Sequence, residues 1–121
     1  MATTKPPKGM VSGLYPQGRV ALSDGATISV NAALGDVFDV TLGGNRTMAA
    51  PTNLTDGQTL IFRIKQDATG SRTITWNAIY DWGDNGAPTL TTTANKIDVV
   101  GGKYHAASNK IHMFPPATGF V

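Results

Sequence analysis

Two histidines, His105 and His112, are the only imidazole groups in this 121-residue chain. Imidazole serves as a general base, a proton shuttle or a metal ligand. If Ser108-Asn109 forms a two-residue turn, His105 falls directly opposite His112 on one face of a hairpin. Two ligands do not complete a metal site within one chain, although symmetry-related copies could add more around an ion on their axis. We therefore expect a solvated or interfacial histidine pair.

A second candidate is the stretch Asp81-Trp82-Gly83-Asp84-Asn85-Gly86, which Tyr80 precedes. Its oxygen side chains suggest calcium, but the acidic 1-3-5 spacing and the terminal Glu of a calcium loop are missing, so turn formation is favoured. Aromatic rings beside Asp and Asn also suit sugar binding, because a ring stacks on the sugar while the polar groups take its hydroxyls. On residue types alone, rings that cap the fold or fill a subunit interface are the favoured alternative. The candidate ligand or interface loop comprises Tyr80, Asp81, Trp82 and Asp84.

No catalytic set emerges from the remaining residues. The chain has no Cys, so cysteine nucleophiles, thiolate zinc sites and disulfides are excluded, and all eight of its acids are Asp. Neither a nucleophile-elbow motif nor a phosphate-binding loop occurs. We predict no enzyme, no catalytic residue, no cofactor and no metal site.

Charge and hydropathy exclude further partners. Charged residues are only 15% of the chain, and the net charge of +2 comes from scattered Lys and Arg, which gives little support for nucleic-acid binding. No apolar run approaches the roughly 20 residues that span a bilayer, and the first residues lack a secretory signal pattern. We expect a soluble protein made in the cytoplasm, with no membrane partner.

The elements that must position these side chains are strands. Thr and Gly are abundant, and short alternating apolar runs are separated by Gly, Asn and Asp turn signals. Gly43-Gly44-Asn45 and Ser108-Asn109 are read as hairpin turns, with a longer loop over 77–88. The pattern predicts an all-β, antiparallel, jelly-roll-like β-sandwich of eight or nine short strands, with an open barrel as the second choice. The expected strands cover 27–30, 36–42, 46–50, 59–65, 72–76, 89–93, 96–100, 103–107 and 110–114.

Three parts are expected along the chain: an extended N-terminal arm (1–19), the β-sandwich (20–114) and a short C-terminal tail (115–121). Pro6-Pro7 and Pro16 favour an extended conformation in the arm. Its apolar side chains could anchor it by edge-strand addition on a neighbouring subunit. The predicted partner-binding anchors are Met10, Val11, Leu14 and Tyr15.

Three segments occur in a recognisable order: Gly44-Asn45-Arg46-Thr47, then Gln66-Asp67-Ala68-Thr69-Gly70-Ser71-Arg72-Thr73, then Pro88-Thr89-Leu90-Thr91-Thr92-Thr93-Ala94-Asn95. With them, residues 24–114 resemble a β-sandwich module of tailed-bacteriophage virion proteins, which occurs in tail and fibre proteins and in small capsid-decorating proteins. The resemblance carries over no catalytic residue. Asp67, Gly70 and Arg72 also suit a fold-making turn, without any ligand.

The resemblance implies a structural virion protein, assembled in the host cytoplasm. Because the chain leaves little room for a fibre shaft, we expect a capsid decoration (cement) protein. It would bind major capsid protein subunits at their junctions as a homotrimer and act by burying intersubunit surface. The alternative is a tail or fibre receptor-binding module that recognises host surface carbohydrate through Tyr80 and Trp82.

Overall fold

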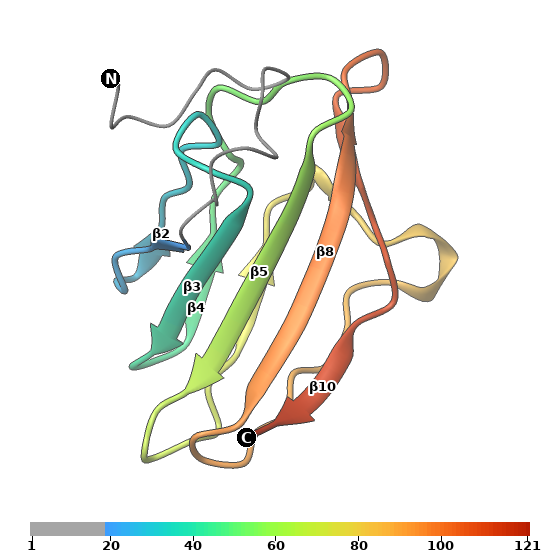
Figure 1. Ribbon diagram of the computed structural model, residues 1–121. Helices are drawn as coiled ribbons and strands as arrows, with labels where there is room; N and C mark the ends of the chain where they lie inside the picture. The colour runs from blue at the N-terminus through green and yellow to red at the C-terminus, as the bar shows by residue number, and fades with distance from the viewer. Residues whose placement is uncertain (1–18) are drawn as a thin grey trace, which may run out of the picture.

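A computed structural model describes residues 19–121, and within this range the fold is all-β without an α-helix (Figure 1). Its elements are β1 (Val20–Ala21), β2 (Thr27–Ile28), β3 (Val37–Leu42), β4 (Arg46–Met48), β5 (Thr59–Gln66), β6 (Ile74–Trp76), β7 (Tyr80–Asp81), the 3-10 turn η2 (Gly83–Asn85), β8 (Ile97–His105), β9 (Lys110–Met113) and β10 (Ala117–Phe120). No described helix is long and apolar enough to cross a membrane.

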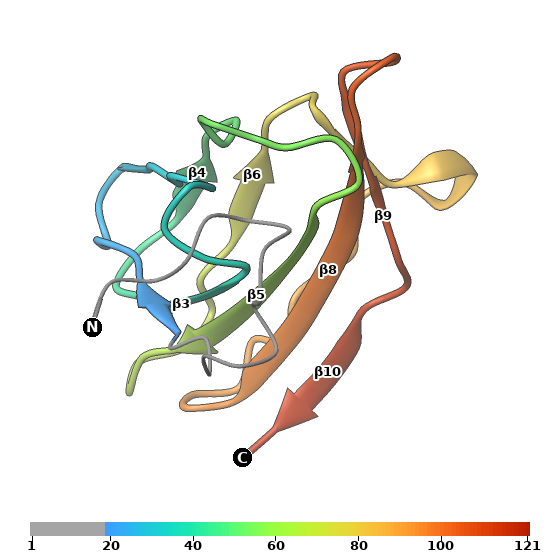
Figure 2. The same cartoon turned by 45° about the horizontal axis from the view of Figure 1, so that its top comes forward.

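The strands form two layers (Figure 2). The larger sheet has the order β1-β3-β5-β8-β9-β7, with β10 also paired to β8, and the smaller sheet has the order β2-β4-β6. Up to β7 the chain alternates between the layers, so each strand is followed by one in the opposite sheet. Neighbours in this part are parallel: β1 with β3, β3 with β5, β2 with β4, and β4 with β6. The first half of the described chain is therefore a two-layer parallel coil.

The turns of this coil differ in length. In the larger sheet Val20 pairs with Phe38 and Phe38 with Phe62, so one turn takes 18 residues and the next takes 24. In the smaller sheet Thr27 pairs with Thr47 and Thr47 with Thr75, offsets of 20 and 28 residues. The extra residues lie in the connections, because the strands of each sheet remain in register.

The C-terminal part of the chain is antiparallel and completes the larger sheet. The long strand β8 pairs with β5 along one edge, and with β9 and then β10 along the other. Pro115-Pro116 separates β9 from β10, since proline cannot donate to a ladder. The β8–β9 hairpin thus lies between β5 and β7. Strand β7 is the strand of this sheet that follows β5 along the coil.

The all-β prediction is confirmed, but the antiparallel jelly-roll-like arrangement is not, because both sheets contain parallel strands. Gly43-Gly44-Asn45 does not close a hairpin; it carries the chain from β3 in one sheet to β4 in the other. A turn signal predicts that the chain changes direction and leaves open which layer the next strand joins. Leu42 and Met48 are both fully buried, so passage to the opposite layer lets both flanking strands cover one core.

Two further strand predictions are wrong in detail. Residues 89–93 form no strand, because side chains hold their backbone: Asp98 Oδ2 accepts from Thr91 N–H, and Gln66 Nε2 donates to Thr91 O. Residues 96–100 and 103–107 were expected as separate strands and instead contribute to the single strand β8. Gly101-Gly102 does not break this strand. Glycine is needed at position 102 because β9 approaches closely there: a Cβ would lie 2.6 Å from the His112 carbonyl oxygen.

The core lies between the layers and includes the aromatic rings of Phe38, Phe62 and Tyr80, against which Trp76 packs. Phe38 stacks on Phe62 at 5.5 Å, and Phe62 meets Trp76 of the opposite sheet edge-on at 6.1 Å. Ile28 and Met48 of the smaller sheet are fully buried opposite them. Burial of large side chains from both sheets is the main stabilising contribution, at about 1.5–3 kcal/mol for each.

Candidate functional site

A chain of aromatic rings runs from the core to the surface and ends in the candidate loop. Trp76 makes edge-on contacts with Tyr80 at 5.0 Å and with Trp82 at 5.2 Å. Tyr80 lies in β7, which pairs with β9, and Trp82 follows immediately. The sequence thus places Tyr80 and Trp82 two positions apart, and the strand directs both rings toward Trp76.

Tyr80 belongs to the core. Its side chain is buried, and its hydroxyl donates to the Ala49 carbonyl oxygen at 2.9 Å. Burial raises the pKa of the phenol well above its ordinary value of 10.0, so the hydroxyl stays protonated. Tyr80 therefore offers no stacking face to a ligand, and its ring packs against Trp76 and Phe62.

Trp82 is half-buried, and its loop projects from the side of the molecule (Figures 1 and 2). Its indole N–H is shielded from solvent and has no acceptor among the described residues. Contact with a ligand would therefore use the ring surface rather than a hydrogen bond from this nitrogen. The loop continues as η2, whose last residue Asn85 is followed by Gly86 at φ 71°.

Beside Trp82 is a small pocket of about 110 Å³, which we call the aromatic pocket. The exposed ring of Phe114 and the Pro115-Pro116 pair contribute apolar surface, and Asn85 contributes an amide. Its lining residues are Trp82, Asn85, Gly86, Pro88, Met113, Phe114, Pro115 and Pro116.

The two acids of the candidate loop lie outside this lining. Asp81 Oδ1 accepts from Gly83 N–H at 2.9 Å, so the carboxylate holds the turn that begins η2. Asp84 is exposed within η2. The structure therefore brings only Trp82 of the four predicted loop residues to the pocket.

The predicted histidine pairing is wrong in register but right in proximity. The turn spans four residues, 106–109, so His105 pairs with Lys110 and His112 with Lys103. The two imidazoles are diagonal neighbours, with stacked rings 5.5 Å apart. His105 Nδ1 also lies 2.9 Å from Ser108 Oγ. Within the described residues no group of three or more His, Asp, Glu or Cys side chains could hold a metal ion.

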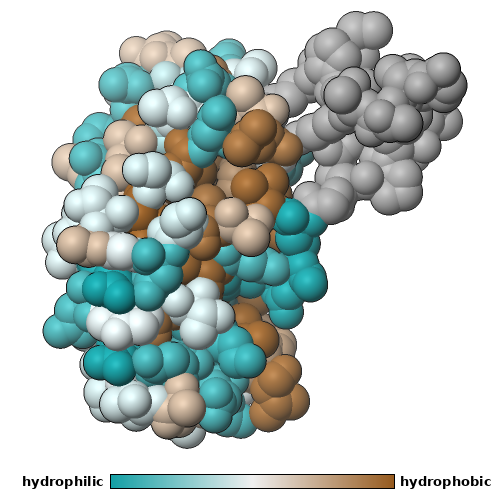
Figure 3. Space-filling model, turned by 90° about the vertical axis from the view of Figure 1, so that its left-hand side faces the viewer, coloured by the Kyte–Doolittle hydropathy of each residue, from teal (hydrophilic) through white to brown (hydrophobic). Residues whose placement is uncertain are grey.

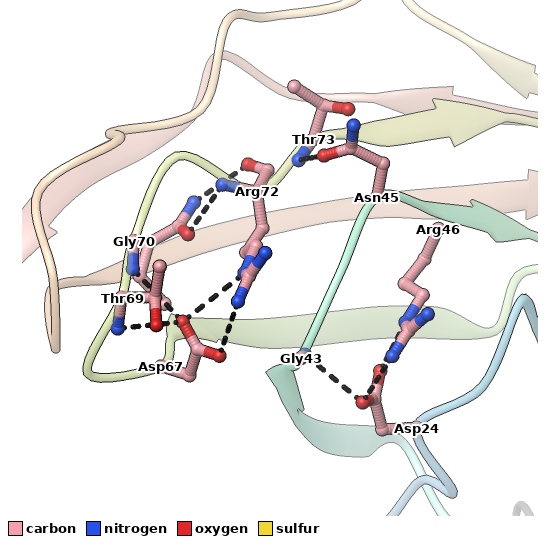
Figure 4. Close-up of polar contacts among 10 residues, drawn as sticks. Asp24, Gly43, Asn45, Arg46, Asp67, Thr69, Gly70, Arg72 and Thr73 are labelled. Carbon is pink, nitrogen blue, oxygen red and sulfur yellow. Dashed lines mark hydrogen bonds and ion pairs between the residues drawn. The ribbon is translucent and has the colours of Figure 1, made fainter.

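The segments that carry the family resemblance form a second region, which we call the polar turn cluster (Figure 4). Asp67 accepts from the backbone N–H groups of Thr69 and Gly70, and its other oxygen lies 3.0 Å from Arg72 Nη2. These interactions close the turn between β5 and β6. The Arg72 hydrogen bond, with the Gly70 N–H, keeps the pKa of the Asp67 carboxyl below its ordinary value of 3.8.

The same cluster joins segments that are far apart in the chain. Asn45 Oδ1 accepts from Thr73 N–H at 3.0 Å, and Arg46 forms a two-pronged ion pair with Asp24 at 2.8 and 2.9 Å. The Arg46 hydrogen bonds lower the pKa of Asp24. Gly70 packs so closely on residues 92–94 that a Cβ there would lie 2.5 Å from the Thr92 carbonyl oxygen. These residues therefore hold the coil together through hydrogen bonds within the chain.

Sequence reasoning missed the contribution of residues 113–116 to the aromatic pocket. Phe114 was assigned to a strand end, and Pro115-Pro116 only to the start of a tail. The sequence feature that could have revealed this contribution is an aromatic residue, Phe114, directly before a proline pair. The pairing of β7 with β9 that brings them to Trp82 could not be read from the chain. The predicted arm anchors Met10, Val11, Leu14 and Tyr15 lie outside the described residues.

Comparison with known families places most of the described residues in one family. Residues 23–105 match the model of a family described as "Putative phage tail fibre C-terminal domain". Comparison with curated proteins and with solved structures gave no match. The match covers more than half of the chain and all three motif segments, and it favours a tail fibre over capsid decoration. The chain therefore belongs to this family of phage tail fibre C-terminal domains and is a structural, non-enzymatic component of the virion.

Proposed function

We propose that this domain is a receptor-binding module of a phage tail fibre and that it recognises host surface carbohydrate through the aromatic pocket. The observation that carries the proposal is the gathering of Trp82, Phe114 and Pro115-Pro116 around a small pocket that also contains the Asn85 amide. Apolar rings suit the C–H face of a sugar, and an amide both donates to and accepts from hydroxyls.

The size of the pocket sets the mode of binding. At about 110 Å³ it is well below the roughly 300–1,000 Å³ of sites that enclose a small molecule. It would hold one face or one edge of a sugar ring and leave the rest of the glycan in solvent. Binding of this kind is weak for one site and suits repeated surface polysaccharide, where several fibre copies act together.

The test is a glycan array followed by titration of any glycan that binds. We expect saturable binding that Phe114→Ala weakens about tenfold, because truncation removes a central apolar contact. Phe120→Ala is the matched control: Phe114 and Phe120 are 45% and 50% exposed, but Phe120 lies in β10, outside the pocket. Trp82→Ala should abolish binding, although it also removes packing against Trp76.

Two results would contradict the proposal: no binding to any surface glycan, or equal losses from Phe114→Ala and Phe120→Ala. The capsid-decoration reading makes the opposite prediction, namely binding to shells through major capsid protein subunits. The family match supports that reading less well than a tail fibre.

The homotrimer stays a prediction under either reading, based on closed symmetry being common among oligomers. Light scattering on the purified chain should give three times the chain mass of 12.7 kDa. A monomer at micromolar concentration would contradict self-trimerisation.

A further inference from the structure

The coil is open at its first turn. Strand β1 forms one edge of the larger sheet and β2 one edge of the smaller sheet, so two edges end side by side on the same side of the molecule. Between them lies a groove of about 460 Å³ whose lining comes from both layers and from the connections next to them. We call this groove, with the edges of β1 and β2, the open coil end.

The backbone at the open coil end is set up to pair with another strand. Residues Ala26 and Ile28 direct their carbonyl oxygens to β4, where the N–H groups of Thr47 and Ala49 donate to them. Successive residues of a strand direct their N–H and C=O groups to opposite sides. The N–H and C=O groups of Thr27 and Ser29 therefore point away from β4. A strand added here would meet the same ladder that β2 offers to β4.

The groove is also apolar at its centre. Val20, Leu22, Val30 and Leu34 contribute side chains to it, and Leu34 is 57% exposed. Viewed from this side, hydrophobic residues form patches separated by polar residues, with one patch in the upper half of the molecule (Figure 3). Each turn of the coil is covered by the next one, whereas the described first turn has no described turn before it.

The sequence before β1 has the spacing of one more turn. Ile28 ends β2, and Val37, which begins β3, follows nine positions later. Val11 likewise stands nine positions before Val20, which begins β1. Met10-Val11 is therefore placed relative to β1 as β2 is placed relative to β3. An apolar residue at position 11 also matches Ile28, which faces the core.

We propose that Met10-Val11 of the same chain docks on the open coil end as a strand parallel to β2, with Val11 entering the groove and Met10 opposite Thr27. These two residues lie outside the described part of the chain, and the open edge together with the spacing carries the proposal. The docked segment would cover the apolar groove and satisfy the outward peptide groups of Thr27 and Ser29.

The absence of cysteine makes a cross-linking test clean. We expect Met10→Cys combined with Thr27→Cys, in the full chain, to form a disulfide within one chain under mild oxidation. Paired strands bring Cα atoms to about 5 Å, within the range that a disulfide spans. Met10→Cys with Ser108→Cys is the control, because Ser108 lies in the exposed β8–β9 turn at the other side of the sheet. The control should cross-link at least about tenfold more slowly.

Hydrogen exchange of the full chain gives a second readout. The amides of Thr27 and Ser29 should exchange at least about tenfold more slowly than freely exposed amides. Val11→Asp should remove this protection, while Thr4→Asp, which adds the same single negative charge at a neutral residue away from the docking pair, should keep it. The amide of Ile64 in β5 should stay protected in both variants, which shows that the coil is folded.

Three results would overturn the proposal. Equal cross-linking with Ser108→Cys would mean that position 10 has no preferred site. Disulfides between chains that increase with protein concentration would mean that a neighbouring copy, and not the same chain, pairs with the edge of β2. Free exchange at Thr27 and Ser29 in the full chain would mean that nothing covers the edge.

Discussion

The polar turn cluster and the aromatic pocket both lie where connections leave the sheets, yet they use their side chains in opposite ways. In the polar turn cluster the side chains of Asp67, Arg72 and Asn45 form hydrogen bonds within the chain. In the aromatic pocket the rings of Trp82 and Phe114 are only partly covered. Satisfied polar groups fix a fold, whereas apolar surface left partly open can receive a partner.

The neighbouring aromatic residues Tyr80 and Trp82 differ in the same way. Tyr80 is buried and hydrogen-bonded to Ala49, while Trp82, two residues later, reaches the pocket. Mutation of Tyr80 should therefore lower stability, as mutation of the polar turn cluster should. Mutation of Trp82 or Phe114 should instead lower the affinity for a ligand. Variants of the two regions therefore separate a loss of stability from a loss of binding.

Gly70→Ala should cause the largest loss of stability. Gly70 has φ +74°, and a Cβ would lie 2.5 Å from Thr92 O and 2.9 Å from Ala94 N, both backbone atoms. We expect a loss of about 3 kcal/mol in the free energy of unfolding, measured by urea denaturation. Gly57→Ala is the control, since Gly57 has φ +80° but open space around it, and it should cost about 1 kcal/mol. Equal losses would mean that the packing on residues 92–94 is unimportant.

Tyr80→Phe should lower stability by about 1–2 kcal/mol, because the Ala49 carbonyl oxygen loses its buried donor. Tyr104→Phe removes a hydroxyl that donates to Asn109 in an exposed bond, and it should cost less than about 0.5 kcal/mol. Thermal unfolding measures both, and glycan affinity should be unchanged in Tyr80→Phe. If Tyr80→Phe kept its stability but lost glycan binding, Tyr80 would have to contribute to the binding site rather than to the core.

Acid should weaken the polar turn cluster. The pKa of Asp67 is lowered from 3.8 mainly by Arg72, and that of Asp24 mainly by Arg46. Their carboxylates therefore stabilise the fold above about pH 4, and this contribution is lost as pH falls through the lowered pKa values. The melting temperature should decline in this range, and less steeply in Asp67→Asn. Asp84→Asn, at an exposed site without an ion pair among the described residues, should leave the slope unchanged.

Asn85→Ala should have the smallest effect on stability, within about 0.5 kcal/mol, because Asn85 is exposed. If the pocket binds glycan, the loss of the amide should lower affinity about fivefold. Asp84→Ala is the control, as Asp84 is next in sequence but does not line the pocket. Calorimetric titration measures both, and a greater loss from Asp84→Ala would shift the site to the outer side of the loop.

Alternation and turn chemistry were enough to predict most strands. The pattern of residues 59–65 places Leu60, Phe62 and Ile64 inward, and all three are buried. The prediction that Asp67 and Gly70 make a turn is also confirmed, because these preferences are local. Parallel pairing was missed, since connections of unequal length hide the repeat of the coil.

The candidate site was predicted only in part, because the sequence shows residue types but not the tertiary contacts between distant segments. Tyr80 and Trp82 were singled out by residue type, but type alone does not distinguish a buried ring from an exposed one. Phe114 and Pro115-Pro116 join the pocket only because β9 pairs with β7. The register of His105 depends on a turn of four residues rather than two, a difference that the Ser108-Asn109 signal did not reveal.

By itself the sequence determined that this protein is built of strands, carries no cysteine chemistry, and uses Asp, Asn and Gly at its turns. These properties follow from side-chain chemistry and from conformational preferences over a few residues. Three features emerge only in the tertiary structure: the layer that each strand joins, the parallel direction of the early strands, and the pocket that Trp82 and Phe114 both line. Those outcomes depend on burying both sheet faces against one core, which is settled by contacts between residues far apart in the chain.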